Sequence, residues 1–209
     1  MKTGYKRRPA RAENLRLALA QEAARVMAEH GIRDFLAAKR KAAERFGVLD
    51  SSVLPKNTEI EAALAQYQRL FVATEHAESL LSQRYVAAEA MRCLSEYEPR
   101  LVGSVLSGTA TAHADVQLHL FADSAEAVLI KLLEESIPHE VTARRVKMNP
   151  ERVLEYPVVL FVLDEQAIEA TVFPADGIRQ APVSPVDGKP MRRANLGEVE
   201  ALIAESAAL

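Results

Sequence analysis

The chain has 209 residues and a net charge of −3, and its 49% of hydrophobic and 26% of charged residues are typical of folded globular proteins, which excludes a disordered or collagen-like chain. Its one cysteine, Cys93, excludes an internal disulfide and a cysteine-based metal cluster. No uncharged run approaches the roughly 18 residues of a membrane span, and the basic start lacks an export signal's apolar core, so we expect a cytoplasmic protein without a membrane partner.

The first 45 residues are basic. They hold 12 Lys and Arg against 5 Asp and Glu, a net charge of +7, whereas residues 46–209 hold 14 against 24, a net charge of −10. Basic helical faces are most often solvated surfaces without a partner. Clustered positive charge also attracts the phosphates of nucleic acids, so nucleic acid is a candidate partner of residues 1–45.

A helical hairpin is predicted at the start of the chain. Apolar residues in 15–27 recur at helical spacing, and His30-Gly31 supplies a C-terminal stop. Asp34 can cap a second helix, which Gly47 ends. We expect these two helices to pack on each other.

A long helical pattern follows the loop at residues 48–56. It starts at Asn57 or Thr58 and reaches about Tyr97, and no Gly or Pro marks the break that is conceivable near Ser79. We therefore expect residues 1–97 to form a helical region, which can also serve as a surface for oligomerisation or for a protein partner.

From Pro99 onward, strand and helix patterns alternate. A Pro- and Gly-rich stretch at 174–195 precedes a last helix that Asn195 and Glu198 can cap. The predicted elements are strands at 100–102, 116–121, 140–147, 157–163 and 167–173, with a hairpin turn at 164–166, and a helix at 125–135 that Asp123 and Glu126 can cap. The sequence thus predicts an α+β protein, with residues 98–209 forming a mixed sheet flanked by helices.

The most informative motif begins at Gly103-Ser104 and continues, after ten residues, with Asp115, one further residue and Gln117. A Gly-Ser turn lets backbone N–H groups and a hydroxyl approach phosphate oxygens. Alternate strand positions place their side chains on one face of a sheet. Over residues 99–174 the chain resembles the DNA polymerase beta-like nucleotidyltransferase superfamily, whose signature is G-S, ten residues, then D-x-D.

The resemblance implies a site for a nucleoside triphosphate and two metal ions, usually Mg²⁺ and sometimes Mn²⁺. Gly103 and Ser104 would bind phosphates. Asp115 would be the first catalytic, metal-binding carboxylate, and Glu169, which alternates suitably in its predicted strand, the third. Gln117 occupies the position of the second carboxylate, where it can contact the nucleotide but brings no charge.

Gln117 leaves two functions open. An amide oxygen ligates Mg²⁺ less well than a carboxylate, which weakens metal binding and slows phosphoryl chemistry. The first interpretation is metal-dependent transfer of a nucleotidyl group to an unknown acceptor. The alternative is a catalytically inactive module that binds nucleotide, nucleic acid or a protein partner.

Several further residues have two interpretations each. His119 shares a strand face with Asp115 and Gln117, and can bind metal or phosphate or simply pack there. A phosphate-binding P-loop is excluded because Thr109 stands where that motif needs Lys. In the Pro-rich stretch, Lys189, Arg192 and Arg193 can contact phosphates or be solvated loop charges.

Overall fold

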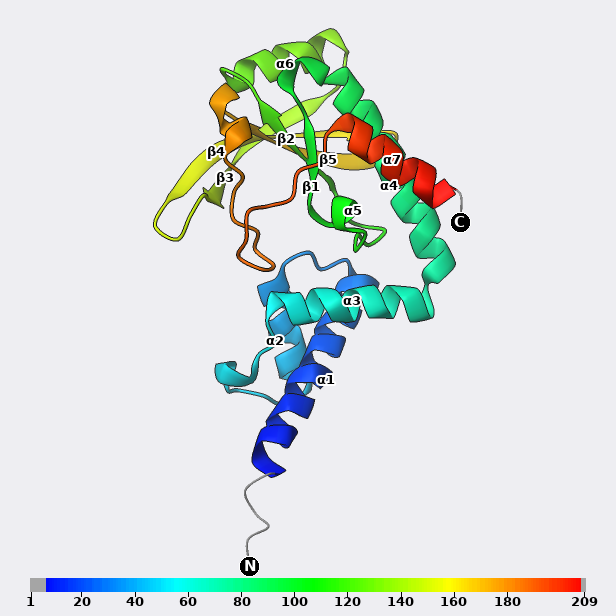
Figure 1. Cartoon of the computed structure of the whole chain (residues 1–209), viewed down its shortest axis with the longest axis vertical. Coiled ribbons are helices and arrows are strands. Elements are labelled where there is room, and N and C mark those ends of the chain that lie inside the picture. The colour runs from blue at the N-terminus through cyan, green and yellow to red at the C-terminus, as the bar shows by residue number, and fades with distance from the viewer. Residues whose placement is uncertain (1–6, 208–209) are drawn as a thin grey trace, which may run out of the picture. The chain divides into compact units, whose positions relative to one another are not determined.

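A computed structural model describes the backbone of residues 7–207 and the side chains of residues 12–206. The chain divides into two compact units (Figure 1). The helical unit contains the residues through His76 together with 185–187, and the sheet unit contains 77–184 and the residues from Gly188 onward. No helix in the described part of the chain is long and apolar enough to cross a membrane.

The helical unit is built from α1 (Arg7–His30), α2 (Phe35–Arg45) and α3 (Asn57–Phe71), with a short 3₁₀ turn at Ser51–Val53. The predicted hairpin of α1 and α2 is confirmed: Gly31 adopts φ +64° after α1, and the Asp34 carboxylate accepts a hydrogen bond from the Ala37 N–H at 2.7 Å. Small residues let the helices approach closely. The buried core includes Leu19, Ala23, Ala38, Ala42, Ile60 and Leu64.

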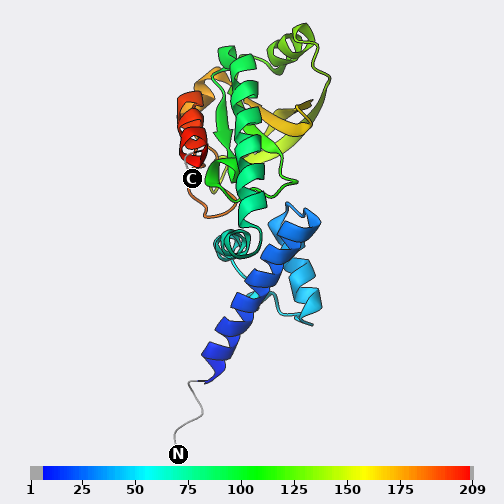
Figure 2. The ribbon, with the colours of Figure 1, turned by 90° about the vertical axis from the view of Figure 1, so that its right-hand side faces the viewer.

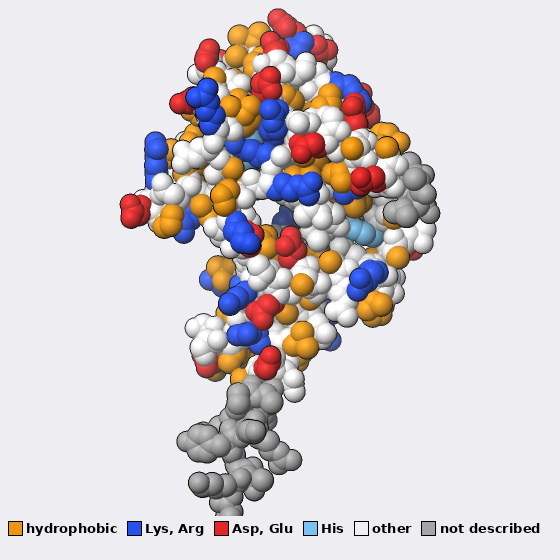
Figure 3. Space-filling view, in the orientation of Figure 1, with side chains coloured by type: hydrophobic (Ala, Val, Ile, Leu, Met, Phe, Trp, Pro, Cys, Tyr) orange, Lys and Arg blue, Asp and Glu red, His pale blue; other side chains and the backbone are white. Residues whose placement is uncertain are grey.

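Basic and acidic side chains are intermixed on the surface of this unit (Figure 3). Arg25 and Arg45 both pair with Glu22, at 2.8 and 3.0 Å, and Arg16 pairs with Glu59 at 3.1 Å. Residues 12–45 hold seven Lys and Arg against five Asp and Glu, a net charge of +2. Most of the positive excess of residues 1–45 therefore lies in residues 1–11, whose side chains are outside the described residues.

The long helix predicted from residue 57 to about 97 is two helices. It breaks at Val72, where φ −139° and ψ 33° end α3, and α4 (Ala73–Cys93) begins immediately afterwards. The break lies seven residues before Ser79. Because Val72 is a common helix residue with no Gly or Pro beside it, periodicity alone does not reveal this position.

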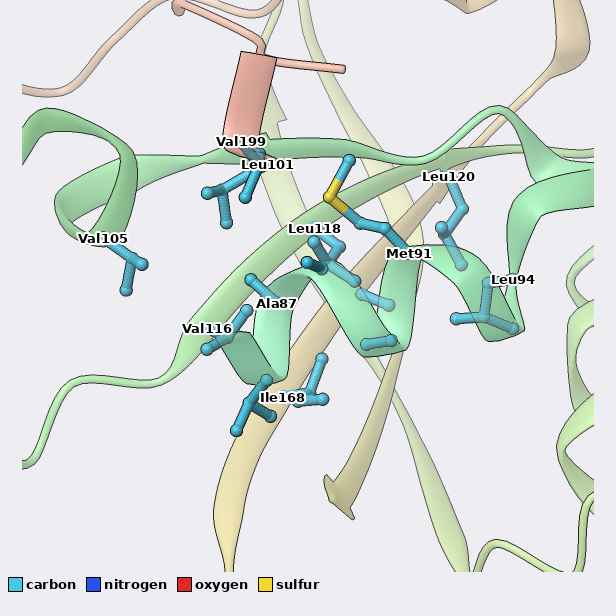
Figure 4. Packing of buried hydrophobic residues seen from close by; sticks show 14 of the residues in the cluster. Ala87, Met91, Leu94, Leu101, Val105, Val116, Leu118, Leu120, Ile168 and Val199 are labelled. Carbon is cyan, nitrogen blue, oxygen red and sulfur yellow. The ribbon is translucent and has the colours of Figure 1, made fainter. Parts of the chain in front are cut away.

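The boundary between the units lies at 76/77 and not at 97/98, where the sequence pattern changes from helical to mixed. The reason is packing. Most of α4 belongs to the sheet unit, since Ala87, Met91 and Leu94 are fully buried in the same core as the strands (Figure 4). The change from a helical to a mixed sequence pattern therefore indicates where the first strand begins. It does not indicate that the preceding helix, α4, packs on the sheet.

The sheet unit is an α+β structure, as predicted. Within the described residues its mixed sheet has five strands in the order β1-β2-β5-β4-β3, with β2 and β5 parallel and the other neighbours antiparallel. The strands are β1 (Arg100–Val102), β2 (Val116–Phe121), β3 (His139–Lys147), β4 (Val153–Leu163) and β5 (Gln166–Phe173). The further helices are α5 (Gly103–Ser107), α6 (Ala125–Glu134) and α7 (Leu196–Ala207), with 3₁₀ turns at Ser95–Tyr97 and Ala175–Arg179.

The two faces of the sheet differ in chemistry. Val116, Leu118 and Leu120 of β2 are fully buried on the face that packs against α4, which runs beside the strands in Figure 2. Because successive strand residues point to opposite sides, Gln117 and His119 lie on the other face. We call this second face the polar face.

Local signals explain most of the remaining elements. Asn195 and Glu198 cap α7 reciprocally, as predicted, with hydrogen bonds of 2.8 and 3.0 Å. The cap of α6 is Ser124, one residue after the predicted Asp123. Strand β4 starts four residues before the predicted Pro157. Proline has no backbone N–H to donate to a neighbouring strand. Pro157 is tolerated because the pairing of β4 with β5 begins only at Val158, so no hydrogen bond to β5 is lost.

Candidate functional site

The turn between β1 and α5 is fitted to the side chain of Gln117. Gly103 has φ +73°, a conformation that residues with a side chain rarely adopt, and a Cβ atom there would collide with Gln117 Oε1. The strand register agrees, since Val102 at the end of β1 pairs with Gln117. Gly103 is therefore needed both for the backbone conformation and for the room that Gln117 occupies.

Ser104 lies in the first turn of α5 and is half-buried. Its carbonyl accepts hydrogen bonds from the N–H groups of Gly108 at 2.9 Å and Thr109 at 3.0 Å, which close this short helix. Gly108, the glycine inside the ten-residue spacer, has φ +83° and ends α5. The spacer glycine thus ends the short helix that follows the Gly103-Ser104 turn.

Glu169 lies beside Gln117, because these two residues are paired in the parallel register of β2 and β5. Its side chain is nearly buried, and the residue is 8% exposed. Arg144 of β3 reaches across β4 and forms a two-pronged ion pair with it, with Nη2 donating to Oε2 at 2.6 Å and Nη1 to Oε1. Such fork-to-fork pairs are among the strongest side-chain interactions. The third carboxylate expected from the sequence is thus bound to an arginine.

Asp115 stands immediately before β2 and is half-buried. It is two residues from Gln117, and it has interaction partners of its own. The loop that carries it is held by Gln166, whose side-chain amide donates to the Ala114 carbonyl at 2.9 Å. Asp115 thus directly precedes β2, as the predicted strand at 116–121 implies.

The expected Mg²⁺ or Mn²⁺ ions do not fit these residues. A two-metal site needs several anionic oxygens directed at the ions. Here Gln117 supplies an uncharged amide, and both carboxylate oxygens of Glu169 accept from Arg144. Among the described residues, no three His, Cys, Asp or Glu side chains come together in a way that could hold a metal ion.

His119 is a buried partner of Arg193. It is 5% exposed, and its Nδ1 accepts a hydrogen bond from Arg193 Nε at 3.0 Å, so the ring proton is on Nε2. Burial, followed by the positive charges of Arg193 and Arg144, lowers the pKa of His119 from 6.5 to about 3. The imidazole is therefore neutral at neutral pH and serves as an acceptor that fixes Arg193.

Arg193 anchors the loop before α7 to the polar face. Its guanidinium lies 4.9 Å from the centroid of the Phe121 ring and 5.3 Å from that of Phe173. Nη1 donates to the carbonyls of Gly177 and Ile178, whereas Nη2 is buried without an acceptor among the described residues. Burial, and then repulsion from Arg100, lowers the pKa of Arg193 to about 10, so this side chain remains charged.

Three arginines from separate elements thus act on the polar face: Arg100 of β1, Arg144 of β3 and Arg193 of the loop before α7. The sequence pattern indicates Arg193 as one of several loop charges, but it gives no sign that Arg100 and Arg144 belong to the site. Arg144 carries no recognisable motif and lies in a strand whose residues are mostly exposed. Glu140, Thr142 and Arg144 are spaced two residues apart, which indicates that they share one face of a strand. This spacing does not indicate that Arg144 contacts a residue beyond β4.

One surface groove among the described residues lies elsewhere in the sheet unit. It is a shallow groove of about 420 Å³ along α4, lined by Leu81, Tyr85 and Asp164 among others. None of the residues of the motif lines it. The candidate site consists of the polar face of the sheet and the Gly103-Ser104 turn, and this groove is separate from it.

Comparisons with known proteins add no relative. No protein-family model matches the chain, and searches of curated proteins and of solved structures return no match. Function is therefore inferred from the residues themselves.

Proposed function

We propose that the sheet unit is a nucleotidyltransferase-like module that binds the phosphates of a nucleoside triphosphate and does not transfer the nucleotide. One observation carries this choice. Beside Gln117, which already lacks a charge, Glu169 is neutralised by Arg144 with two hydrogen bonds. Two of the three carboxylate positions that the resemblance assigns to metal are therefore unsuited to it.

Phosphate binding is supported by the turn and by the charges near it. Gly103 and Ser104 are half-buried, so part of the turn is open to a ligand. Arginines are the residues best suited to phosphate oxygens, because their planar forks donate two parallel hydrogen bonds. Arg144 has N–H groups beyond the two that bind Glu169, and its side chain is 46% exposed.

Metal-dependent nucleotidyl transfer to an unknown acceptor is the second candidate. The register favours it, since Gln117 and Glu169 are direct neighbours and Asp115 precedes Gln117 by one strand period. This reaction would require Glu169 to leave Arg144, which costs a charge-assisted ion pair at a nearly buried site. We rank it second for that reason.

Equilibrium dialysis with labelled nucleoside triphosphates tests the binding function. Wild type should retain label, and Ser104→Ala should weaken retention, because a phosphate contact is lost. Ser107→Ala is the matched control: Ser107 belongs to the same helix but is exposed, and its hydroxyl contacts Thr109 and the Ser104 carbonyl, so the Ser104 hydroxyl is left intact. No retention of any nucleotide by wild type would contradict the proposal.

Transfer is tested separately with the same labelled nucleotides. Wild type and Gln117→Asp are incubated with Mg²⁺ or Mn²⁺ and cell extract, and label is sought on protein, RNA and small molecules. We expect no transfer by wild type. Metal-dependent labelling that wild type catalyses and Asp115→Ala does not would make the second candidate the correct one.

A further inference from the structure

The sheet unit holds a fixed cation where the resemblance places metal ions. We propose that Arg144 is this built-in cation, and that it binds a phosphate group of the ligand without a divalent metal. The inference rests on the proposed function, because it names how the same site holds phosphate. It departs from the metal-dependent binding that the resemblance implies.

The position of Arg144 carries the inference. The guanidinium is bound to Glu169, which lies next to Gln117, and Gln117 in turn lies against Gly103 of the turn. The Arg144 side chain starts from β3 and crosses β4, so its positive charge lies at β5, the strand next to β2, which carries Gln117. Glu169 holds the guanidinium in this place through two hydrogen bonds.

Arg144 keeps the capacity for another acceptor. A guanidinium has five N–H groups, and the ion pair with Glu169 uses two of them. The Arg144 side chain is 46% exposed, whereas that of Glu169 is 11% exposed. A phosphate can therefore approach the arginine from solvent while the carboxylate stays paired, and Glu169 acts as a positioning residue.

The surrounding charges favour an anion over a cation. Arg193 is held at the same face by His119, and the positive charges of Arg193 and Arg144 both lower the pKa of this imidazole. Glu169 offsets the charge of Arg144, whereas the neutral imidazole leaves the charge of Arg193 in place. An incoming divalent cation would meet these guanidinium groups, whereas a phosphate is attracted by them.

The test is calorimetric titration of inorganic tripolyphosphate into the full chain, once with EDTA and once with Mg²⁺. Wild type should bind in EDTA, and Mg²⁺ should not tighten binding. Arg144→Gln should weaken binding by about 10- to 100-fold, the range expected for losing charge-assisted contacts. Arg145→Gln is the matched control, because Arg145 is the next residue, is exposed and points to the other face.

Arg144→Gln alone leaves the nearly buried Glu169 carboxylate without its ion pair, which can destabilise the fold. The double variant Arg144→Gln, Glu169→Gln removes this carboxylate and therefore separates a loss of binding from a loss of stability. It should lose binding as the single variant does, with an unchanged circular dichroism spectrum. If wild type binds only with Mg²⁺, or if the Arg144 and Arg145 variants bind alike, the built-in cation is wrong and the proposed function stands. If wild type binds triphosphate in neither buffer, the proposed function fails as well.

Discussion

Gly103 and Gln117 depend on each other. The glycine leaves the space in which the Gln117 amide lies, and the amide closes one side of the turn. A carboxylate in place of Gln117 would bring a negative charge to the same space, next to Glu169. The uncharged amide is therefore compatible with the Arg144–Glu169 pair, because it neither attracts Arg144 away nor repels Glu169.

Replacing Gly103 by alanine should destabilise the protein by about 2–4 kcal/mol, since the left-handed backbone costs about 1–2 kcal/mol and the collision with Gln117 adds overpacking. Gly188→Ala is the control. Gly188 has nearly the same φ, +74°, but nothing lies within 4 Å of a Cβ atom there, so its loss should be about 1–2 kcal/mol. Urea unfolding measures both. The double variant Gly103→Ala, Gln117→Ala should recover part of the loss, and equal losses at both glycines would show that Gln117 does not fill the turn.

The lowered pKa of His119 predicts that the protein loses stability as the pH falls. Its folded-state pKa of about 3 lies below the ordinary 6.5, so the unfolded chain binds the extra proton as the pH falls below 6.5. Stability that is fully present above pH 6.5 should decrease by about 2 kcal/mol at about pH 5. His119→Asn keeps an acceptor for Arg193 and cannot titrate, so its unfolding free energy should lack this decrease. Parallel pH profiles for the two proteins would show that His119 is not the group responsible.

Among the elements, those with local signals were predictable. The caps of α2 and α7 and the hairpin between β4 and β5 follow from short-range chemistry, and the two turn residues, Asp164 and Glu165, both have positive φ as a tight hairpin requires. The motif likewise predicted that Gln117 lies against the turn at Gly103. The break at Val72 was not predictable, because no Gly or Pro marks the end of α3 there.

The ionic partners of the site were also beyond sequence reasoning. Arg144 and Glu169 are 25 residues apart and on strands that are not neighbours, so their contact depends on the strand order. Arg193 meets His119 across 74 residues. A residue pattern shows which face of a strand a side chain occupies, but it does not show which charge lies opposite.

The assignment of α4 to the sheet unit predicts where the chain can be cut. A fragment of residues 77–209 should fold cooperatively, because it retains the buried face of α4. A fragment of residues 98–209 loses Ala87, Met91 and Leu94 from the core, and should expose the apolar side of the sheet and aggregate. Thermal unfolding followed by circular dichroism distinguishes them, and a cooperative transition in the shorter fragment would contradict the boundary at 76/77.

At the scale of the whole molecule, residues 1–45 carry a net positive charge and residues 46–209 a net negative charge. The side chains of α1 and α2 that the structure describes offer little net charge, and several are paired with each other. Nucleic-acid binding, if it belongs to residues 1–45, should therefore depend chiefly on residues 1–11.

Deleting residues 1–11 removes five Lys and Arg and should weaken the binding of a single-stranded oligonucleotide at least tenfold at low salt. The affinity of the full chain should fall steeply with salt, and the deletion should flatten this slope. Replacing Lys39 and Arg40 of α2 by glutamine is the control within the described residues, with a smaller effect. Fluorescence anisotropy measures the affinity of both variants. Unchanged binding after the deletion would show that residues 1–11 are not a nucleic-acid site.

The central claim is that the sheet unit binds a nucleoside triphosphate through its own arginines and not through metal ions. The most direct measurement is calorimetric titration of ATP into the full chain with EDTA and, in parallel, with saturating Mg²⁺. If the claim holds, Glu169 remains bound to Arg144, so Mg²⁺ should not lower the dissociation constant by more than about threefold, a difference of less than 1 kcal/mol. Binding that is absent in EDTA and appears with Mg²⁺ would contradict the claim, and would mean that Glu169 leaves Arg144 to hold a metal ion.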